Sequence, residues 1–245
     1  MLEPFTNQAA GLQGLAPRMV PKLIAVASHG QQQGELPLLW SLCTTWVEMG
    51  LPVMVLDGHA HESDQNPGLL QMLANPLSPL HDTQESVSWS VLPAARGFQQ
   101  LPEQGFNSHT VGNLFQNFGI VLLYADAVTL TGLLKDSGLT PLVVLAPLKA
   151  SSLSAYQTLK QLLLNAHLYP TVANIAFEPH ENTKAPSPVQ NLQHCAMTFL
   201  GLSIKPITVT ATASANDSRD EVMRLALQLM ENSTVLERYP TTRTH

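Results

Sequence analysis

The stretch Ile24-Ala25-Val26-Ala27-Ser28-His29-Gly30-Gln31-Gln32-Gln33-Gly34-Glu35-Leu36 decides the fold of this chain. Its apolar first part belongs to a run from Lys22 to Ala27 that predicts a buried strand. We expect a turn after this strand, with Gly30 and Gly34 as possible turn residues. Apolar residues then recur at helical spacing, at Leu39, Leu42, Cys43, Trp46 and Val47. We expect the helix to end at Gly50, because glycine commonly ends helices.

Similar apolar runs predict strands along the rest of the chain. They are Pro52 to Asp57, Ser86 to Leu92, Ile120 to Tyr124, Leu142 to Ala146, Thr171 to Phe177 and Pro206 to Thr210. Continuous apolar strands that are separated by helices form parallel sheets covered on both faces. We therefore predict an α/β fold, with a mostly parallel, twisted sheet of about seven strands and helices on both faces.

Helical patterns lie between and after the later strands. They cover Ser152 to His167, Val189 to Leu200, and a last helix that we expect to open at the capping-box pattern Ser218 to Glu221. The apolar face of this last helix consists of Val222, Leu225, Ala226, Leu229 and Met230, and we expect it to pack onto the sheet. Polar, proline-containing segments predict long surface loops at residues 62–85, 93–108 and 178–188.

The composition limits the classes of function. The chain has 245 residues, of which 44% are hydrophobic, so one large core is the simplest interpretation. The net charge of -6, without a basic stripe, argues against nucleic-acid binding. The sequence lacks an apolar run long enough to span a membrane and a signal-peptide pattern, so we expect a cytoplasmic protein. Cys43 and Cys195 lie in apolar helical patterns and are expected to be buried thiols.

The loop after the first strand has the position of a phosphate-binding P-loop. Such a loop needs glycines that wrap a phosphate, a lysine for the β and γ phosphates, and a Ser or Thr hydroxyl for Mg²⁺. Here Glu35 occupies the lysine position and Leu36 the hydroxyl position. A carboxylate there repels phosphate by about 1 kcal/mol in water, and by several times more if it is partly buried. We therefore expect no cofactor. Weak, residual binding of ATP and Mg²⁺ is the alternative, and its site would consist of Ser28, His29, Gly30, Gln33, Gly34, Asp57 and Asp126.

The stretches IAVAS…G, from Ile24, and VMVLDG, from Val53, give the chain a resemblance to the MinD/ParA family of P-loop ATPases. The resemblance covers residues 20–235 in spacing and strand order, and implies a MinD-like P-loop NTPase fold. Several positions of the family differ in this chain. Gly30 stands in place of the signature lysine, and His59 in place of the carboxylate that orients the attacking water. Tyr124 stands in place of the carboxylate of the fourth strand, with Asp126 two residues later, and Phe177-Glu178 replaces the base-recognising Asn-Arg pair. These losses imply a catalytically degenerate protein without enzyme activity. If the protein is an enzyme, the resemblance implies that it hydrolyses ATP.

The segment before the first strand resembles the D/N-Q-A-x-x-L-R segment of the FlhG (FleN/YlxH) branch of this family. Asn7, Gln8, Ala9 and Leu12 match it, and Gln13 replaces the arginine. In that branch the segment binds the signal-recognition-type GTPase FlhF and stimulates its GTP hydrolysis, which limits flagellar number and position. The resemblance implies that residues 7–13 bind such a partner, with Gln8 able to orient water near a phosphate.

We therefore expect three parts: a flexible partner-binding segment at residues 1–20, a MinD-like domain at 21–238 and a tail at 239–245. The leading hypothesis is a regulator of flagellar assembly that acts by contact. An active ATPase that uses His29, Asp57 and Asp126 is one alternative, and a MinD-like scaffold of a pilus or polysaccharide secretion system is another. Homodimerisation stays open, and membrane contact is expected to be peripheral at most.

A second candidate site follows the second strand. His59 and His61 lie near Glu62 and Asp64, and imidazoles with carboxylates suit zinc. A matching cluster is missing downstream. We therefore expect surface histidines and a solvated acidic turn, without a metal.

Overall fold

The computed structural model describes residues 20–29, 32–75, 88–104, 112–176, 187–210 and 215–236. Within these ranges one sheet contains β1 (Lys22–Ser28), β2 (Val53–Asp57), β3 (Trp89–Pro93), β4 (Ile120–Asp126), β5 (Leu142–Leu145), β6 (Thr171–Ala176), β7 (Ile207–Thr210) and β8 (Thr234–Val235). Seven of them pair in the order β3-β2-β4-β1-β5-β6-β7, and all these pairs are parallel. The short β8 pairs antiparallel with β1. The predicted fold class is confirmed.

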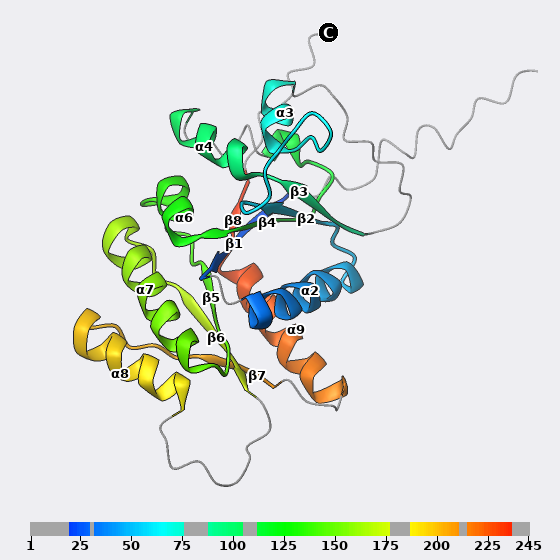
Figure 1. The fold of residues 1–245 in the computed structure, drawn as a ribbon. Coiled ribbons are helices and arrows are strands. Elements are labelled where there is room, and N and C mark those ends of the chain that lie inside the picture. Colours follow the sequence, from blue (N-terminus) through cyan, green and yellow to red (C-terminus); the bar gives the residue numbers. More distant parts are fainter. Residues whose placement is uncertain are drawn as a thin grey trace, which may run out of the picture.

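Helices cover both faces of the sheet (Figure 1). On one face α2 (Gln32–Glu48) packs beside α9 (Ala215–Glu231). The other face is covered by α3 (Leu69–Ala74), α4 (Ala95–Gln104), α6 (Ala127–Leu134), α7 (Lys149–Ala166) and α8 (Pro188–Leu200). The sheet is therefore the middle layer of three.

The alternation of side chains along β1 shows why its sequence is apolar throughout. Leu23, Ala25 and Ala27 pack into the core beneath α6 and α7, whereas Ile24 and Val26 pack into the core beneath α2 and α9. Successive residues of a strand point to opposite faces, so a strand that is covered on both sides must be apolar at every position. β2 and β4 follow the same rule.

Two predicted loops contain helices instead. α3 lies within residues 62–85 and α4 within 93–108, so the loop predictions are wrong there. The apolar signal is sparse because each short helix buries few side chains, such as Leu69 of α3 and Phe98 and Leu101 of α4. Most of the predicted loop at 178–188 lies outside the described residues.

The ends of the helices test the predictions of start and stop signals. Gly50 has a φ of +81° in the turn that follows the last residue of α2, Glu48, which confirms that the helix ends there. α9 begins at Ala215, so Ser218 lies inside the helix and does not open it. The apolar face of α9 is buried against the sheet through Val222, Leu225, Ala226 and Leu229, as expected.

The two cysteines differ. Cys43 is buried in α2, and burial raises the pKa of its thiol to about 12. Cys195 of α8 is partly exposed, so the expectation of two buried thiols is wrong for this residue. In the described part of the chain, none of the helices has the length and apolar character needed to cross a membrane.

Candidate functional site: a carboxylate held at the carboxyl edge of the sheet

The candidate site lies where β1, β4 and β5 end and α2 begins. Ser28 is the last residue of β1, and Glu35 lies in the first turn of α2. Gly34 allows this close approach, since a Cβ at that position would meet the Cβ of Ala146 at 2.7 Å. The amide of Ala146 donates to the hydroxyl oxygen of Ser151 at 2.9 Å, which ties the end of β5 to α7. The backbone thus brings the start of α2 against the end of β5.

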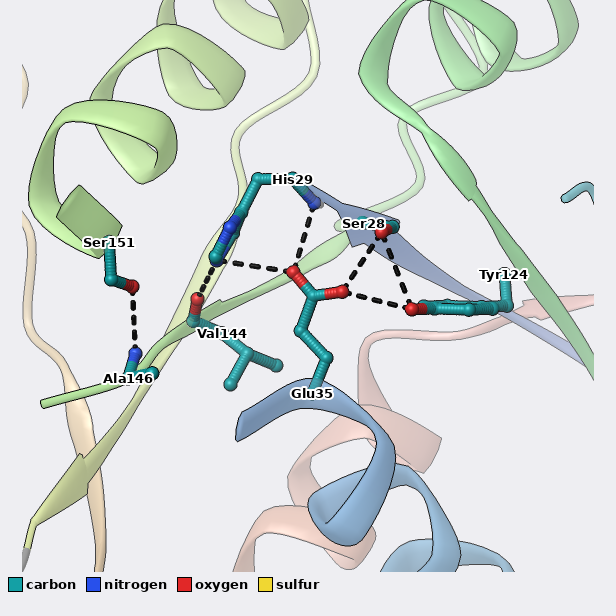
Figure 2. A network of polar contacts seen from close by, with 7 residues as sticks. All are labelled: Ser28, His29, Glu35, Tyr124, Val144, Ala146 and Ser151. Carbon is teal, nitrogen blue, oxygen red and sulfur yellow. Dashed lines mark hydrogen bonds and ion pairs between the residues drawn. The ribbon is translucent and has the colours of Figure 1, made fainter. Parts of the chain in front are cut away.

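The side chain of Glu35 points into this junction and is bound there from three directions (Figure 2). The residue is 1% exposed. The hydroxyls of Ser28 and Tyr124 each donate to its Oε2 at 2.9 Å, and the backbone N–H of His29 donates to Oε1 at 2.9 Å. Both carboxylate oxygens are therefore satisfied from within the chain, by groups at the carboxyl ends of β1 and β4.

The imidazole of His29 closes the fourth side of the carboxylate. Its Nε2 lies 3.2 Å from Oε1 of Glu35 and beside the carbonyl oxygen of Val144 on β5. The side chain is 2% exposed. Within the described structure Nδ1 is buried without a hydrogen-bond partner. His29 is therefore engaged by Glu35 and β5 through one ring nitrogen, and its second nitrogen is unused.

Tyr124 stands where the resemblance places a carboxylate of the fourth strand. Burial raises the pKa of its hydroxyl, a hydrogen bond with Ser28 lowers it, and the nearby negative charge of Glu35 raises it again, with a net upward direction. The hydroxyl therefore stays protonated at physiological pH and remains a donor to Glu35. Its ring packs edge-on against His59, with ring centroids 5.1 Å apart.

The other predicted nucleotide-binding residues take separate roles. Asp57 ends β2 beside Tyr124 of β4, and its Oδ1 accepts the backbone N–H of His59 at 2.9 Å. Asp126 is exposed and caps α6 by accepting the N–H of Thr129 at 2.8 Å. Gly30 and the side chain of Gln33 lie outside the described residues, as do the proposed partner-binding residues Asn7, Gln8, Ala9, Leu12 and Gln13.

The sequence indicates that Glu35 lies shortly after β1, but it does not reveal which residues donate hydrogen bonds to the carboxylate. Ser28 and His29, which the sequence predicts as residual nucleotide ligands, both bind Glu35 in the structure. Tyr124 was noted as a missing carboxylate, although its hydroxyl is one of the three donors. A buried tyrosine at the end of an otherwise aliphatic strand was the available signal, since a buried hydroxyl needs a polar partner.

The acidic turn after β2 corrects another expectation. His59, His61 and Asp64 are exposed as predicted, but Glu62 is 3% exposed. Its carboxylate accepts the backbone N–H groups of Arg96 and Gly97 at 2.8 Å and that of Leu70 at 3.4 Å. Burial raises the pKa of Glu62, and the backbone N–H groups of Arg96 and Gly97 lower it by more, so the net direction is downward.

Glu62 thus anchors the turn to the starts of α3 and α4. Among the described residues no group of three or more His, Cys, Asp or Glu side chains is arranged to hold a metal ion.

Solved structures share this arrangement of strands and helices. The chain is similar to a chain of the MinC:MinD cell division protein complex of Aquifex aeolicus, with a TM-score of 0.56 and 15% identity over 89% of this chain and 99% of that one. It is similar to a ParA family ATPase of Chlorobium tepidum, with a TM-score of 0.51 and 13% identity over 87% and 96%. Cobyrinic acid a,c-diamide synthase of Mycobacterium smegmatis, solved with ADP and magnesium, gives a TM-score of 0.56 and 13% identity over 86% and 94%.

The chain therefore has the fold seen in the MinC:MinD complex and in a ParA family ATPase. The sequence matches no protein-family model and no curated protein. The three similar structures have different functions by name, so the shared fold does not choose among them. Function must be argued from the site.

Proposed function

We propose that this protein is a regulatory binding protein with a MinD/ParA-type fold, which acts by contact and does not hydrolyse ATP. One observation supports the proposal most strongly. The residue at the P-loop lysine position, Glu35, is buried and accepts hydrogen bonds from Ser28, His29 and Tyr124. An internal carboxylate thus uses the donors of Ser28 and His29, where the loop after β1 begins, together with the hydroxyl of Tyr124 on β4.

Electrostatics argue against a nucleotide's terminal phosphate next to this carboxylate. Two like unit charges 4 Å apart repel by about 4 kcal/mol at the effective dielectric of a partly buried site. A phosphate would also have to displace Glu35 from its donors, which leaves a buried carboxylate unsatisfied. Leu36 supplies no hydroxyl for Mg²⁺ and is 43% exposed. These residues do not fit a magnesium–nucleotide complex, and we derive no step through one.

Calorimetric titration of the full chain with ATP and MgCl₂ tests this part of the proposal. We expect no saturable heat of binding, and no Mg²⁺-dependent phosphate release above that of the buffer. Glu35→Gln is the matched variant, because it removes the charge and keeps the size of the side chain. Tight, Mg²⁺-dependent binding of ATP by the unmodified protein would overturn the proposal in favour of an active ATPase.

We further propose that the regulated system is flagellar assembly and that the partner is an FlhF-type GTPase. The support is the match of Asn7, Gln8, Ala9 and Leu12 to the FlhG-branch segment. In the sequence this segment precedes β1, whereas Glu35 follows β1. A similar structure solved as a MinC:MinD complex gives a precedent for protein contact on such a scaffold.

Binding to a purified FlhF-type GTPase tests the partner. We expect the full chain to bind, and we expect removal of residues 1–16 to reduce the affinity at least about tenfold, which corresponds to about 1.4 kcal/mol. Gln8→Ala should lower any stimulation of GTP hydrolysis more than it lowers binding. A chain with residues 1–16 in scrambled order is the matched control. Equal binding by the full and the truncated chain would exclude the proposed contact, and no binding at all would favour a scaffold of another system.

A further inference from the structure

A pocket of about 270 Å³ opens on the α2 side of the sheet, beside the Glu35 site. Its walls include Leu36 and Trp40 of α2, Val55 of β2, and Trp89 and Val91 of β3. β3 is the end strand of the main sheet path, and α2 leaves it incompletely covered. Trp40 is 61% exposed and Val91 is 53% exposed. The apolar walls of the pocket are thus open to a partner.

Two indole rings form part of these walls. The rings of Trp40 and Trp89 meet edge to face, with centroids 4.7 Å apart and an interplanar angle of 84°. Tryptophan is the aromatic side chain that attracts cations most strongly through its ring face. A planar cation can also stack on it, as guanidinium groups do.

Asp57 is the charged residue among those that line the pocket. Its Oδ1 accepts the N–H of His59, and no other hydrogen bond or ion pair joins the carboxylate of Asp57 to a described residue. The hydroxyl of Tyr124, which also borders the pocket, donates to Glu35. The pocket therefore offers apolar walls, two indoles and one carboxylate with capacity for a cation.

We propose that this pocket binds an arginine side chain of a protein partner. The apolar stem of arginine suits the walls, its guanidinium group stacks on tryptophan, and its planar fork pairs with a carboxylate. Lysine pairs with Asp57 as a point charge and lacks the planar group that stacks. The volume lies below the range of about 300–1,000 Å³ typical for drug-sized ligands, which fits a single side chain better than a nucleotide. This inference does not depend on the identity of the regulated system.

The three tryptophans of the chain supply the assay. Trp46 is fully buried in α2, and its indole N–H donates to the carbonyl oxygen of Ala226 at 3.4 Å, so its NMR signal is an internal control. We would titrate the full chain with the blocked peptide Gly-Gly-Arg-Gly-Gly and follow the three indole N–H signals. The same peptide with citrulline, which is planar and uncharged, is the matched probe, and one with norleucine tests apolar binding.

We expect arginine to shift the signals of Trp40 and Trp89 in a saturable way and to leave that of Trp46 unmoved. Citrulline should bind about five- to tenfold more weakly, because it lacks the charge that Asp57 and the indole faces attract. Asp57→Asn should remove most of this difference in affinity. Trp40→Ala should weaken the binding of both the arginine and the citrulline peptide. Asp64→Asn, at an exposed acid outside the pocket, should change nothing.

Three results would overturn the proposal: no shift of Trp40 and Trp89 beyond that of Trp46, equal binding of all three peptides, or full arginine affinity in Asp57→Asn. An unchanged Trp46 signal in each variant verifies that the variant is folded.

Discussion

Glu35 and Glu62 are both buried glutamates near the carboxyl edge of the sheet, but different kinds of donor hold them. Glu35 binds two side-chain hydroxyls, one backbone N–H and an imidazole, from β1 and β4. Glu62 binds backbone N–H groups at the starts of α3 and α4. Backbone donors at helix starts exist whatever the side chains are, whereas the donors of Glu35 depend on Ser28, His29 and Tyr124. Glu62 thus anchors the backbone of the turn after β2. Glu35 instead belongs to a network of side chains with Ser28, His29 and Tyr124.

The largest effect is expected at the anchor. Glu62→Ala leaves three backbone N–H groups without their acceptor and should lower the free energy of unfolding by about 2–4 kcal/mol. The exposed Asp64 of the same turn is the matched control, and Asp64→Ala should stay within about 0.5 kcal/mol. Urea unfolding of both variants measures the difference. If the two variants proved equally stable, Glu62 would not be an anchor.

At Glu35 the expected loss is smaller and shared. Glu35→Ala should cost about 1–3 kcal/mol, because the hydroxyls of Ser28 and Tyr124 lose an acceptor. Tyr124→Phe should cost about 1 kcal/mol alone. In a double-mutant cycle the two changes should couple by at least about 0.5 kcal/mol, as expected for residues in one hydrogen-bond network. Strict additivity in urea unfolding would mean that the network contributes nothing to stability.

A glycine beside each carboxylate allows a further comparison. A Cβ at Gly68 would meet the backbone carbonyl oxygen of Pro93 and would lie 2.6 Å from Cγ of Glu62. A Cβ at Gly34 would lie 2.7 Å from the Cβ of Ala146. Such overpacking costs about 1–3 kcal/mol. We expect Gly68→Ala to destabilise more than Gly34→Ala in thermal unfolding.

Gly132 of α6 is the control, because a Cβ there has nothing within 4 Å. Gly132→Ala should raise stability by about 0.5–1 kcal/mol, the usual gain of alanine over glycine in a helix. A Gly34→Ala variant as stable as Gly132→Ala would show that α2 does not need its close approach to β5.

The smallest effect is a dependence on pH. The folded state holds the pKa of Glu62 below its ordinary value of 4.5, so the charged form contributes stability above that value. This contribution is lost as the pH falls through the lower, folded pKa. The stability difference between the unmodified protein and Glu62→Gln should therefore be constant from pH 7 to about 5, and shrink at lower pH. Urea unfolding at successive pH values measures it, and a difference that grew on acidification would show the opposite shift.

Local patterns were sufficient for most of the framework and failed where apolar signals were short. The strands at Lys22, Pro52, Ile120 and Leu142 were predicted to within a few residues, because strands covered on both faces must be apolar at each position. α3 and α4 were missed, since a helix that rests on a sheet by one or two side chains leaves little periodic signal. The short β8 was missed for a related reason, because a strand of two residues contains no apolar run that the sequence could show.

The candidate site was predicted in part. The place of Glu35 shortly after the first strand could be predicted, because the order of strand, turn and helix is local in the sequence. Its role as an internally bound carboxylate could not be predicted, because Tyr124 is 89 residues away. For Glu62 the same reasoning gave a solvated residue, since its donors at Arg96 and Gly97 lie more than 30 residues on.

The sequence by itself determined the layered α/β framework and the place of an acidic residue at the start of the helix after the first strand, because each depends on neighbours along the chain. The tertiary structure alone decided what the acid meets. Parallel pairing of β1 with β4 sets Val26 beside Tyr124 and Ser28 beside Asp126, and so brings two hydroxyls to one carboxylate. A buried polar group takes its role from the partners that reach it, and distant strands supply those partners only after the sheet has formed.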